Sequence, residues 1–126
     1  MLLTYSYKAT VVRCVDGDSV ILDIDCGFDI QLKAQSVRLY GIDTAETRGG
    51  TEDLKALGNL AKSYVSQMIP EGSEVLLKTH LDGRGKFGRI LAEVFMPEAP
   101  DTEGYQPRSL NEILLDELLA VPYHGQ

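Results

Sequence analysis

The feature of this sequence that most constrains its fold is an alternation of apolar and polar side chains in the first third of the chain. A β-branched stretch, residues 8–15, is followed by two alternating stretches, residues 20–26 and 28–39, with glycine-containing turns between them. Alternation at every second residue is typical of a strand with one buried face. Three such strands joined by short turns predict an antiparallel meander, with a bulge expected near Ser36 in the third strand.

The spacing of the apolar residues changes in the second half of the chain. From Glu52 to the residue before Pro70, they recur at intervals of three and four, which predicts an amphipathic helix. Its predicted buried face consists of Leu54, Leu57, Ala61, Tyr64, Val65 and Met68. Residues 74–79 and 89–96 are predicted to form two further strands, joined by a glycine-rich loop at 81–88.

The last part of the chain predicts a surface loop and a second helix. Residues 97–107 are rich in proline, and Ser109 with Glu112 forms a capping box that marks a helix start. The apolar face of this helix is expected to contain Leu110, Ile113, Leu114 and Leu118. The whole order predicts an α+β fold: a five-stranded antiparallel OB-type barrel, with one helix between strands three and four and another after strand five.

Composition places the chain among ordinary globular proteins. It has 126 residues, of which 44% are hydrophobic and 25% charged, and residues 1–126 contain no repeat or linker, which predicts a single domain. No apolar run approaches the roughly 18 residues of a membrane span. The N-terminal residues lack the pattern of a signal peptide, so we expect a cytoplasmic protein with no membrane partner. A monomer is the default expectation.

The charge balance is acidic, with a formal net charge of −7. Residues 97–126 carry six acidic side chains against Arg108 alone, so most of the excess lies in the last quarter of the chain. This balance argues against a broad electropositive surface for nucleic acid, while a local cationic site in the rest of the chain stays possible. Any binding to nucleic acid is expected to weaken as salt rises.

The two cysteines are expected to be reduced. If the first turn is centred near Gly17, Cys14 lies opposite Ser19 or Val20, too far along the hairpin to form a disulfide with Cys26. With no Cys-x-x-Cys motif, both are interpreted as half-buried thiols.

Charged residues of both signs gather at the predicted strand ends. They are Asp18 in the first turn, Arg38 in the third strand, Asp43 and Glu46 just after it, and Lys86 and Arg89 before the fifth strand. Carboxylates are hard oxygen ligands suited to Ca²⁺ or Mg²⁺, and a third carboxylate can accept a proton from an attacking water. Arginines can hold a phosphate and stabilise charge in a five-coordinate transition state. The pattern therefore suggests phosphodiester cleavage.

Each of these pieces also has a structural interpretation. Asp16-Gly17-Asp18 is a common turn sequence, Arg38 can serve as an ion-pair partner, and Lys86 with Arg89 can form a solvated hairpin tip. Only their combination favours a catalytic site.

Three segments of the chain resemble the signature segments of the staphylococcal nuclease (thermonuclease) family. They are residues 16–20 (DGDSV), 37–47 (VRLYGIDTAET) and 85–89 (GKFGR), in the family's order and at plausible spacings. The resemblance extends over roughly residues 8 to 124. It implies an OB-type barrel with helices and a Ca²⁺-dependent nuclease that cleaves single-stranded or frayed DNA and RNA and leaves 3′-phosphates.

Carried over residue by residue, the resemblance implies a role for each motif position. Asp18 and Asp43 would bind Ca²⁺ through their carboxylates and Thr44 through its main-chain carbonyl. Glu46 would be the general base or would orient the water. Arg38 and Arg89 would stabilise the transition state. The side chains that contact the substrate would be Lys86, Phe87 and Tyr123.

The sequence departs from the family pattern at four motif positions. Ala45 replaces a proline, which leaves the turn before Glu46 less rigid, and Ser19 replaces a threonine. Gly85 and Phe87 replace an aspartate and a tyrosine, which changes the loop expected to contact substrate. All the catalytic residues of the family pattern are present, whereas some of the residues expected to contact substrate are replaced.

A Ca²⁺-dependent nuclease is therefore the first functional hypothesis. The alternative is a non-catalytic OB-type module that binds nucleic acid or protein, although such relatives usually lose the carboxylates or arginines. A third interpretation is an interaction protein that uses the acidic C-terminal part and the 97–107 loop. Binding without turnover would favour the second hypothesis, and loss of a partner on loop deletion would favour the third.

Overall fold

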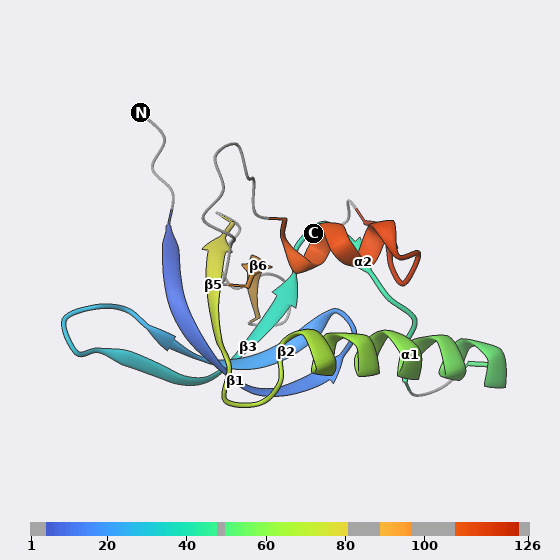
Figure 1. The fold of residues 1–126 in the computed structure, drawn as a ribbon, viewed down its shortest axis with the longest axis horizontal. Helices are drawn as coiled ribbons and strands as arrows, with labels where there is room; N and C mark the ends of the chain where they lie inside the picture. Colours follow the sequence, from blue (N-terminus) through green and yellow to red (C-terminus); the bar gives the residue numbers. More distant parts are fainter. Residues whose placement is uncertain (1–4, 48–49, 81–88, 97–107, 124–126) are drawn as a thin grey trace.

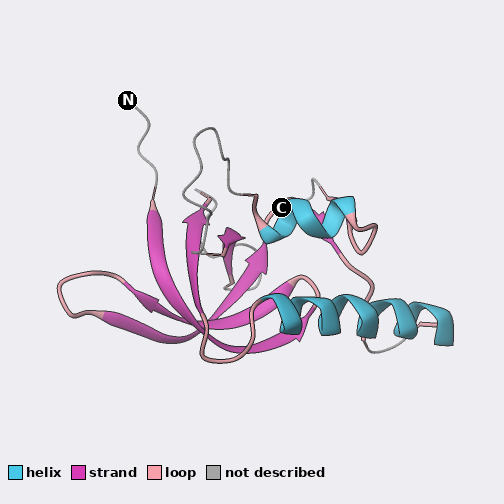
Figure 2. Cartoon of the chain, in the orientation of Figure 1, coloured by secondary structure: helices cyan, strands magenta, loops and turns pink. Residues whose placement is uncertain are grey.

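The structure is a computed structural model that describes residues 5–47, 50–80, 89–96 and 108–123. The strands are β1 (Ser6–Asp16), β2 (Ser19–Asp25), β3 (Gln31–Leu39), β4 (Ile42–Asp43), β5 (Glu74–Thr79), β6 (Ile90–Phe95) and β7 (Val121–Pro122). The helices are α1 (Glu52–Met68) and α2 (Leu110–Asp116). In the view of Figures 1 and 2, both helices lie in the right-hand half of the picture, α2 above α1, and the β2–β3 hairpin turn extends to the left.

Five strands form a closed barrel in the order β1-β2-β3-β6-β5, which confirms the predicted OB-type architecture. Four pairings are antiparallel, but β3 and β6 are parallel, with Val37 opposite Ile90 and Leu39 opposite Ala92. The expectation of an entirely antiparallel barrel is therefore wrong at this one pairing. The reason is geometric, because strand direction cannot alternate all the way round a ring with an odd number of strands.

The barrel interior is filled by the alternating apolar residues of its strands. Fully buried side chains come from all five strands and from both helices, and include Val11, Val20, Leu22, Val37, Leu39, Val75, Leu77, Val94, Val65, Leu110 and Leu114. Burial of one such side chain stabilises the fold by roughly 1.5–3 kcal/mol. The period-two signal in the sequence thus corresponds to the inward face of the barrel.

The third strand is shorter than expected. Phe28 and Asp29 have positive φ angles of 56° and 60° and form the hairpin turn, in which the N–H of Ile30 donates to the carbonyl of Gly27 at 2.9 Å. Phe28 is 98% exposed. A strand pattern that begins at residue 28 is therefore wrong, because the turn takes up the first residues.

The bulge in β3 lies earlier than expected. The register with β2 shifts between Leu22, which pairs with Gln35, and Ile24, which pairs with Leu32. The extra residue therefore falls before Gln35 and not near Ser36. Ala34 has a φ of 51°, and its N–H donates to Asp23 Oδ1 at 2.7 Å, which stabilises the irregular backbone.

Helix α1 begins at a Thr51 cap, whose hydroxyl accepts the N–H of Leu54 at 3.2 Å. Its buried residues are Gly58, Ala61 and Val65. The N-terminal half extends past the strands (Figure 1), so Leu54 and Leu57 are about half exposed. Their predicted place on the buried face is wrong, because the barrel does not reach that part of the helix.

Helix α2 begins where the capping box predicts, with the Ser109 hydroxyl accepting the N–H of Glu112 at 3.1 Å. It ends at Asp116, and Leu118 follows in the left-handed region with a φ of 60° and is 87% exposed. Leu118 therefore does not share the buried face of the helix, contrary to expectation. The chain then forms β7, which pairs with β4 in a small second sheet that the sequence did not indicate.

The cysteines behave as predicted. Cys14 pairs with Val20 across the first hairpin, and both Cys14 and Cys26 are free. Burial raises the pKa of the Cys14 thiol. Within the described residues, neither helix combines the length and the apolar character needed to cross a membrane.

Candidate active site

Three side chains from separate parts of the chain meet beside the start of β2 and the end of β3. Arg38 Nη1 lies 3.0 Å from Asp18 Oδ2, and Arg38 Nη2 lies 3.2 Å from Asp43 Oδ1. Asp18 comes from the β1–β2 turn, Arg38 from β3 and Asp43 from β4. The structure thus brings together three of the residues that the sequence proposed for the site, in one charged cluster.

The backbone around the cluster is tied together by Asp18. Its carbonyl accepts the N–H of Leu39 at 2.8 Å. Its carboxylate accepts the N–H of Thr44 at 3.1 Å and the hydroxyl of Ser19 at 3.2 Å. The Asp18 side chain therefore fixes the first turn to the segment that follows β3. Asp43 is held from the other side, because β4 pairs with β7 and places Asp43 opposite Val121.

The cluster is graded in exposure. The side chains of Arg38 and Asp18 are 9% and 13% exposed, while that of Asp43 is 52% exposed. Glu46 is exposed as well. A buried guanidinium with two carboxylate partners satisfies the ion-pair interpretation of Arg38, and it also presents carboxylate oxygens of Asp43 to solvent. The two interpretations of Arg38 are therefore compatible.

Negative charge is in excess at Asp43. Burial is the largest cause that raises the pKa of its carboxyl, and the neighbouring Asp18 carboxylate and the charge of Glu46 act in the same direction. Arg38 opposes the shift without cancelling it. An added cation would relieve this crowding, so the donor set fits a hard divalent ion.

The described ranges contain no cluster of three or more His, Cys, Asp or Glu side chains arranged around a metal position. Two carboxylates supply only part of the roughly six to eight oxygens that Ca²⁺ takes. A bound ion would therefore need main-chain carbonyl and water oxygens in addition. This requirement matches the expectation that Thr44 contributes its carbonyl.

The loop after β4 is closely packed. Thr44 is buried, and its Oγ1 is the buried side-chain polar atom of the described residues that has no hydrogen-bond partner. Thr47 Oγ1 donates to Asp16 Oδ1 at 2.8 Å, which ties the end of the loop to the first hairpin. Glu46 lies between these two anchored residues.

Of the remaining predicted site residues, two can be placed. Arg89 is half-buried and directly precedes β6, and the parallel pairing of β6 with β3 sets Leu91 opposite Arg38. The ring of Tyr123 lies 5.7 Å from the Arg38 guanidinium carbon. The backbone N–H of Tyr123 donates to the carbonyl of Gly41 at 2.9 Å. Lys86 and Phe87 lie outside the described residues.

Sequence reasoning missed Asn111, a buried residue of α2. Its Nδ2 donates to the carbonyls of Tyr40 at 2.8 Å and Ala92 at 3.2 Å, and its Oδ1 accepts the N–H of Val94 at 3.2 Å. It thereby connects the end of β3 to β6. A polar residue next to the helix cap gave no sign of this burial.

A stacked pair lies beside this connection. The rings of Tyr40 and His80 are 3.6 Å apart and nearly parallel, and His80 Nε2 is 3.0 Å from Glu93 Oε2. No sequence motif pointed to these contacts, because they join residues far apart in the chain.

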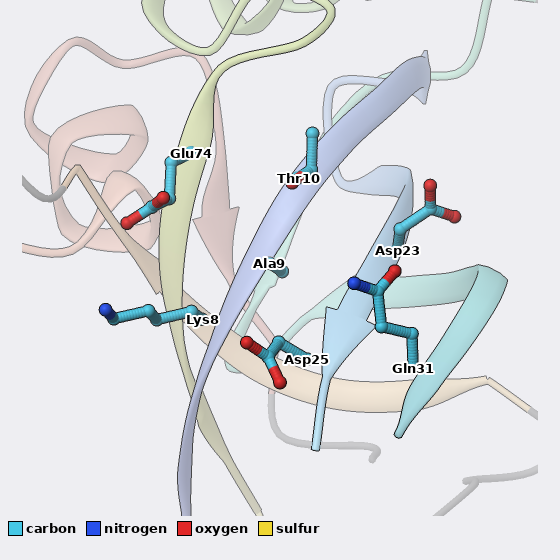
Figure 3. Close-up of a pocket in the computed structure, with 7 residues that line it drawn as sticks. All are labelled: Lys8, Ala9, Thr10, Asp23, Asp25, Gln31 and Glu74. Atoms are coloured by element: carbon cyan, nitrogen blue, oxygen red, sulfur yellow. The ribbon is translucent and has the colours of Figure 1, made fainter. Parts of the chain in front are cut away.

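A pocket lined by residues of β1, β2, β3 and β5 is a separate feature (Figure 3). Lys8, Asp25 and Glu74 are among its lining side chains, and none of the predicted site residues takes part. Asp25 Oδ1 accepts the N–H of Gly27 at 2.8 Å, so it already serves the hairpin turn. This pocket is not the candidate active site.

Comparisons with a family model and with individual proteins point to the same family. The sequence model of the family described as "Staphylococcal nuclease homologue" matches residues 36–126, a range that includes Arg38 to Glu46 and begins after Asp18. The thermonuclease of Staphylococcus hyicus is 30% identical over 91 residues, which are 72% of this chain and 48% of that protein. The thermonuclease of Staphylococcus intermedius is 33% identical over 86 residues, 68% of this chain and 47% of that protein.

The chain therefore spans about half the length of the curated relatives it matches. The matched range of the family model covers most of the chain and contains the last part of β3, all of β4 and both helices. The barrel of the structure agrees with the fold that the motifs implied. The chain belongs to the staphylococcal nuclease homologue family.

Proposed function

We propose that this protein is a Ca²⁺-dependent nuclease that hydrolyses phosphodiester bonds of single-stranded or frayed DNA and RNA and leaves 3′-phosphates. The observation that carries the proposal is the cluster in which buried Arg38 contacts both Asp18 and Asp43. Family membership and the names of the two thermonuclease relatives support it.

Asp18 and Asp43 would hold the metal through their carboxylates, with the carbonyl of Thr44 as a further ligand. A bound Ca²⁺ supplies positive charge that polarises a phosphoryl oxygen of the substrate. The raised pKa of Asp43 supports this placement, because an added cation favours the ionised carboxylate.

The chain's own residues would carry the proton transfer and the charge stabilisation. Glu46 orients a water and takes its proton while the water oxygen attacks phosphorus. The bond from phosphorus to the 5′ oxygen breaks, so the phosphate stays on the 3′ side and the leaving oxygen gains a proton from solvent. Arg38 and Arg89 stabilise the charge that builds up on the phosphoryl oxygens.

Substrate binding is assigned to Lys86, Phe87 and Tyr123. The ring of Tyr123 lies 5.7 Å from the Arg38 guanidinium carbon, which supports a substrate-contacting role for it. With a net charge of −7, the protein is expected to bind nucleic acid weakly and to lose affinity as salt rises. An affinity that does not change with salt would contradict this part of the proposal.

A Ca²⁺-titrated assay on single-stranded DNA and on RNA tests the activity. Cleavage should require Ca²⁺ and stop when chelator is added. Loss of one preorganised charge-stabilising group often costs about 10²–10³-fold in rate, and losses of at least this order are expected for Arg38→Ala, Arg89→Ala and Glu46→Gln. Arg13→Ala removes the same charge from an exposed position of β1 and serves as the matched control.

Intact single-stranded DNA at high enzyme and Ca²⁺ would overturn the proposal. Oligonucleotide binding without turnover would favour the binding-module alternative instead. The cytoplasmic location, the single-domain organisation and the monomeric state stay predictions, which cell fractionation, limited proteolysis and sedimentation would test.

A further inference from the structure

A glycine in the interior of α1 lies against the loop that carries Glu46. Gly58 is buried, and glycine inside a helix is less favourable than alanine by roughly 1 kcal/mol, so its presence calls for a packing reason. A Cβ built on Gly58 would lie 2.4 Å from the carbonyl oxygen of Glu46, 2.6 Å from its carbonyl carbon and 2.8 Å from the carbonyl oxygen of Ala45. All three are backbone atoms, which cannot rotate aside as a side chain can.

One helical turn further on, α1 meets the first hairpin in the same manner. A Cβ on Gly17 would lie 2.7 Å from the Ala61 Cβ and 3.0 Å from Thr44 Oγ1. The turn before Asp18, the loop after β4 and α1 therefore meet closely at two glycines and at the small side chains of Thr44 and Ala61. In Figure 1 the segment that follows β3 runs down to α1, where this contact is made.

This packing has a direct consequence for Glu46. Glu46 is exposed, so the position that its carboxylate can reach depends on where the backbone of the loop is held. Ala45, directly before it, has a free φ angle where a proline would restrict the turn. The neighbours Thr44 and Thr47 are anchored to the first hairpin by hydrogen bonds of 3.1 and 2.8 Å.

We infer that Gly58 is a positioning residue for Glu46: by lacking a side chain, it lets α1 seat the carbonyls of Ala45 and Glu46 and so directs the Glu46 carboxylate toward the Asp18–Arg38–Asp43 cluster. The catalytic consequence rests on the proposed function, while the packing role stands on the geometry alone.

The expected effect of Gly58→Ala follows from the distances. Ordinary contact begins at 3.4 Å, so the Glu46 carbonyl must move away by about 1.0 Å to admit a Cβ. A misplacement of about 1 Å in a catalytic group can cost on the order of 10²-fold in rate. The loss should appear in kcat, with KM and the half-saturating Ca²⁺ concentration little changed, because Asp18 and Asp43 keep their places.

A double-mutant cycle on the full chain separates positioning from general damage. Gly58→Ala, Glu46→Gln and the double variant are compared with wild type for kcat on single-stranded DNA. If Gly58 acts through Glu46, Gly58→Ala lowers kcat about 10²-fold alone and adds little in the Glu46→Gln background. An equal fractional loss in both backgrounds would overturn the inference, because it would show damage unrelated to Glu46.

Thermal unfolding gives a readout that does not need activity. At an exposed helical position alanine stabilises, and Asn59→Ala on the outer side of α1 is the matched control. Gly58→Ala should instead lower Tm and shift the backbone amide resonances of residues 45–47. A raised Tm with unchanged resonances would refute the packing role, even if the wild-type protein proves inactive and the proposed function fails.

If Gly58→Ala does not fold, Ala61→Gly tests the same packing at the contact between Ala61 and Gly17. Removing the Ala61 methyl loosens α1 against the Gly17 turn, and a smaller loss of kcat is expected that again vanishes in the Glu46→Gln background. A loss that persists there would count against the inference.

Discussion

Replacing Arg38 by methionine tests the energetics of the charged cluster. Methionine keeps much of the side-chain volume and removes the guanidinium that contacts Asp18 at 3.0 Å and Asp43 at 3.2 Å. Removing one partner of a buried ion pair typically costs about 3–5 kcal/mol, because the other charge is left uncompensated. Since the Asp43 side chain is 52% exposed and can be hydrated, we expect the lower end, about 3 kcal/mol. For a chain of this size that corresponds to a Tm lower by roughly 12 °C.

The loss should depend on pH in a defined direction. The pKa of Asp43 is already raised in the folded protein, and Arg38 is the group that opposes the shift. Without Arg38 the pKa rises further. A carboxyl with a raised folded-state pKa destabilises the fold when ionised, and this effect disappears as the pH falls through that pKa. The difference between wild type and Arg38→Met should therefore be larger at pH 7.5 than near pH 4.

Urea unfolding followed by circular dichroism, in metal-free buffer at both pH values, measures the difference. Arg13→Met is the matched control, because Arg13 is exposed on β1 and its loss should change stability by less than about 0.5 kcal/mol. If Arg38→Met is as stable as wild type at pH 7.5, the reasoning is refuted. Such a result would mean that burial of this cluster costs as much as its ion pairs contribute.

Two further substitutions test local features of the backbone and the core. Thr44→Val should raise the free energy of unfolding by about 1 kcal/mol, because the buried Oγ1 has no partner; a loss of stability in urea would show that the hydroxyl is satisfied. Leu118→Gly should stabilise by up to about 1 kcal/mol, since Leu118 has a φ of 60° and is 87% exposed. Leu118→Ala keeps the Cβ and should not stabilise, and equal gains from both variants would exclude backbone strain as the cause.

The strands and their inward faces could be predicted from the sequence because burial and alternation are local properties. Leu22 and Ile24 point into the core as their spacing requires, and the capping box at Ser109 marks a real helix start. The same local signals misplaced the start of β3 and its bulge. Phe28 and Ala34 adopt positive φ angles that neither residue prefers, and such angles depend on neighbours such as Asp23 across the hairpin.

The candidate site shows the same division. The sequence alone identified Asp18, Arg38, Asp43, Glu46 and Arg89 as residues of interest, because carboxylates and arginines at strand ends carry recognisable chemistry. It could not show that Arg38 contacts both aspartates, because the three residues come from separate segments. Their roles in catalysis stay a proposal that the variants above test.

By itself, then, the sequence determined the barrel class, the order of its elements and the family motifs, since these depend on residue type and spacing along one chain. Only the tertiary structure decided the parallel pairing of β3 with β6, the exposure of Leu54 and Leu57, and the burial of Asn111. It also decided the contact of Gly58 with the backbone of Glu46. Each of these depends on how close two distant segments come, and closeness in space is set by the closure of the barrel and by the seating of α1 beside it.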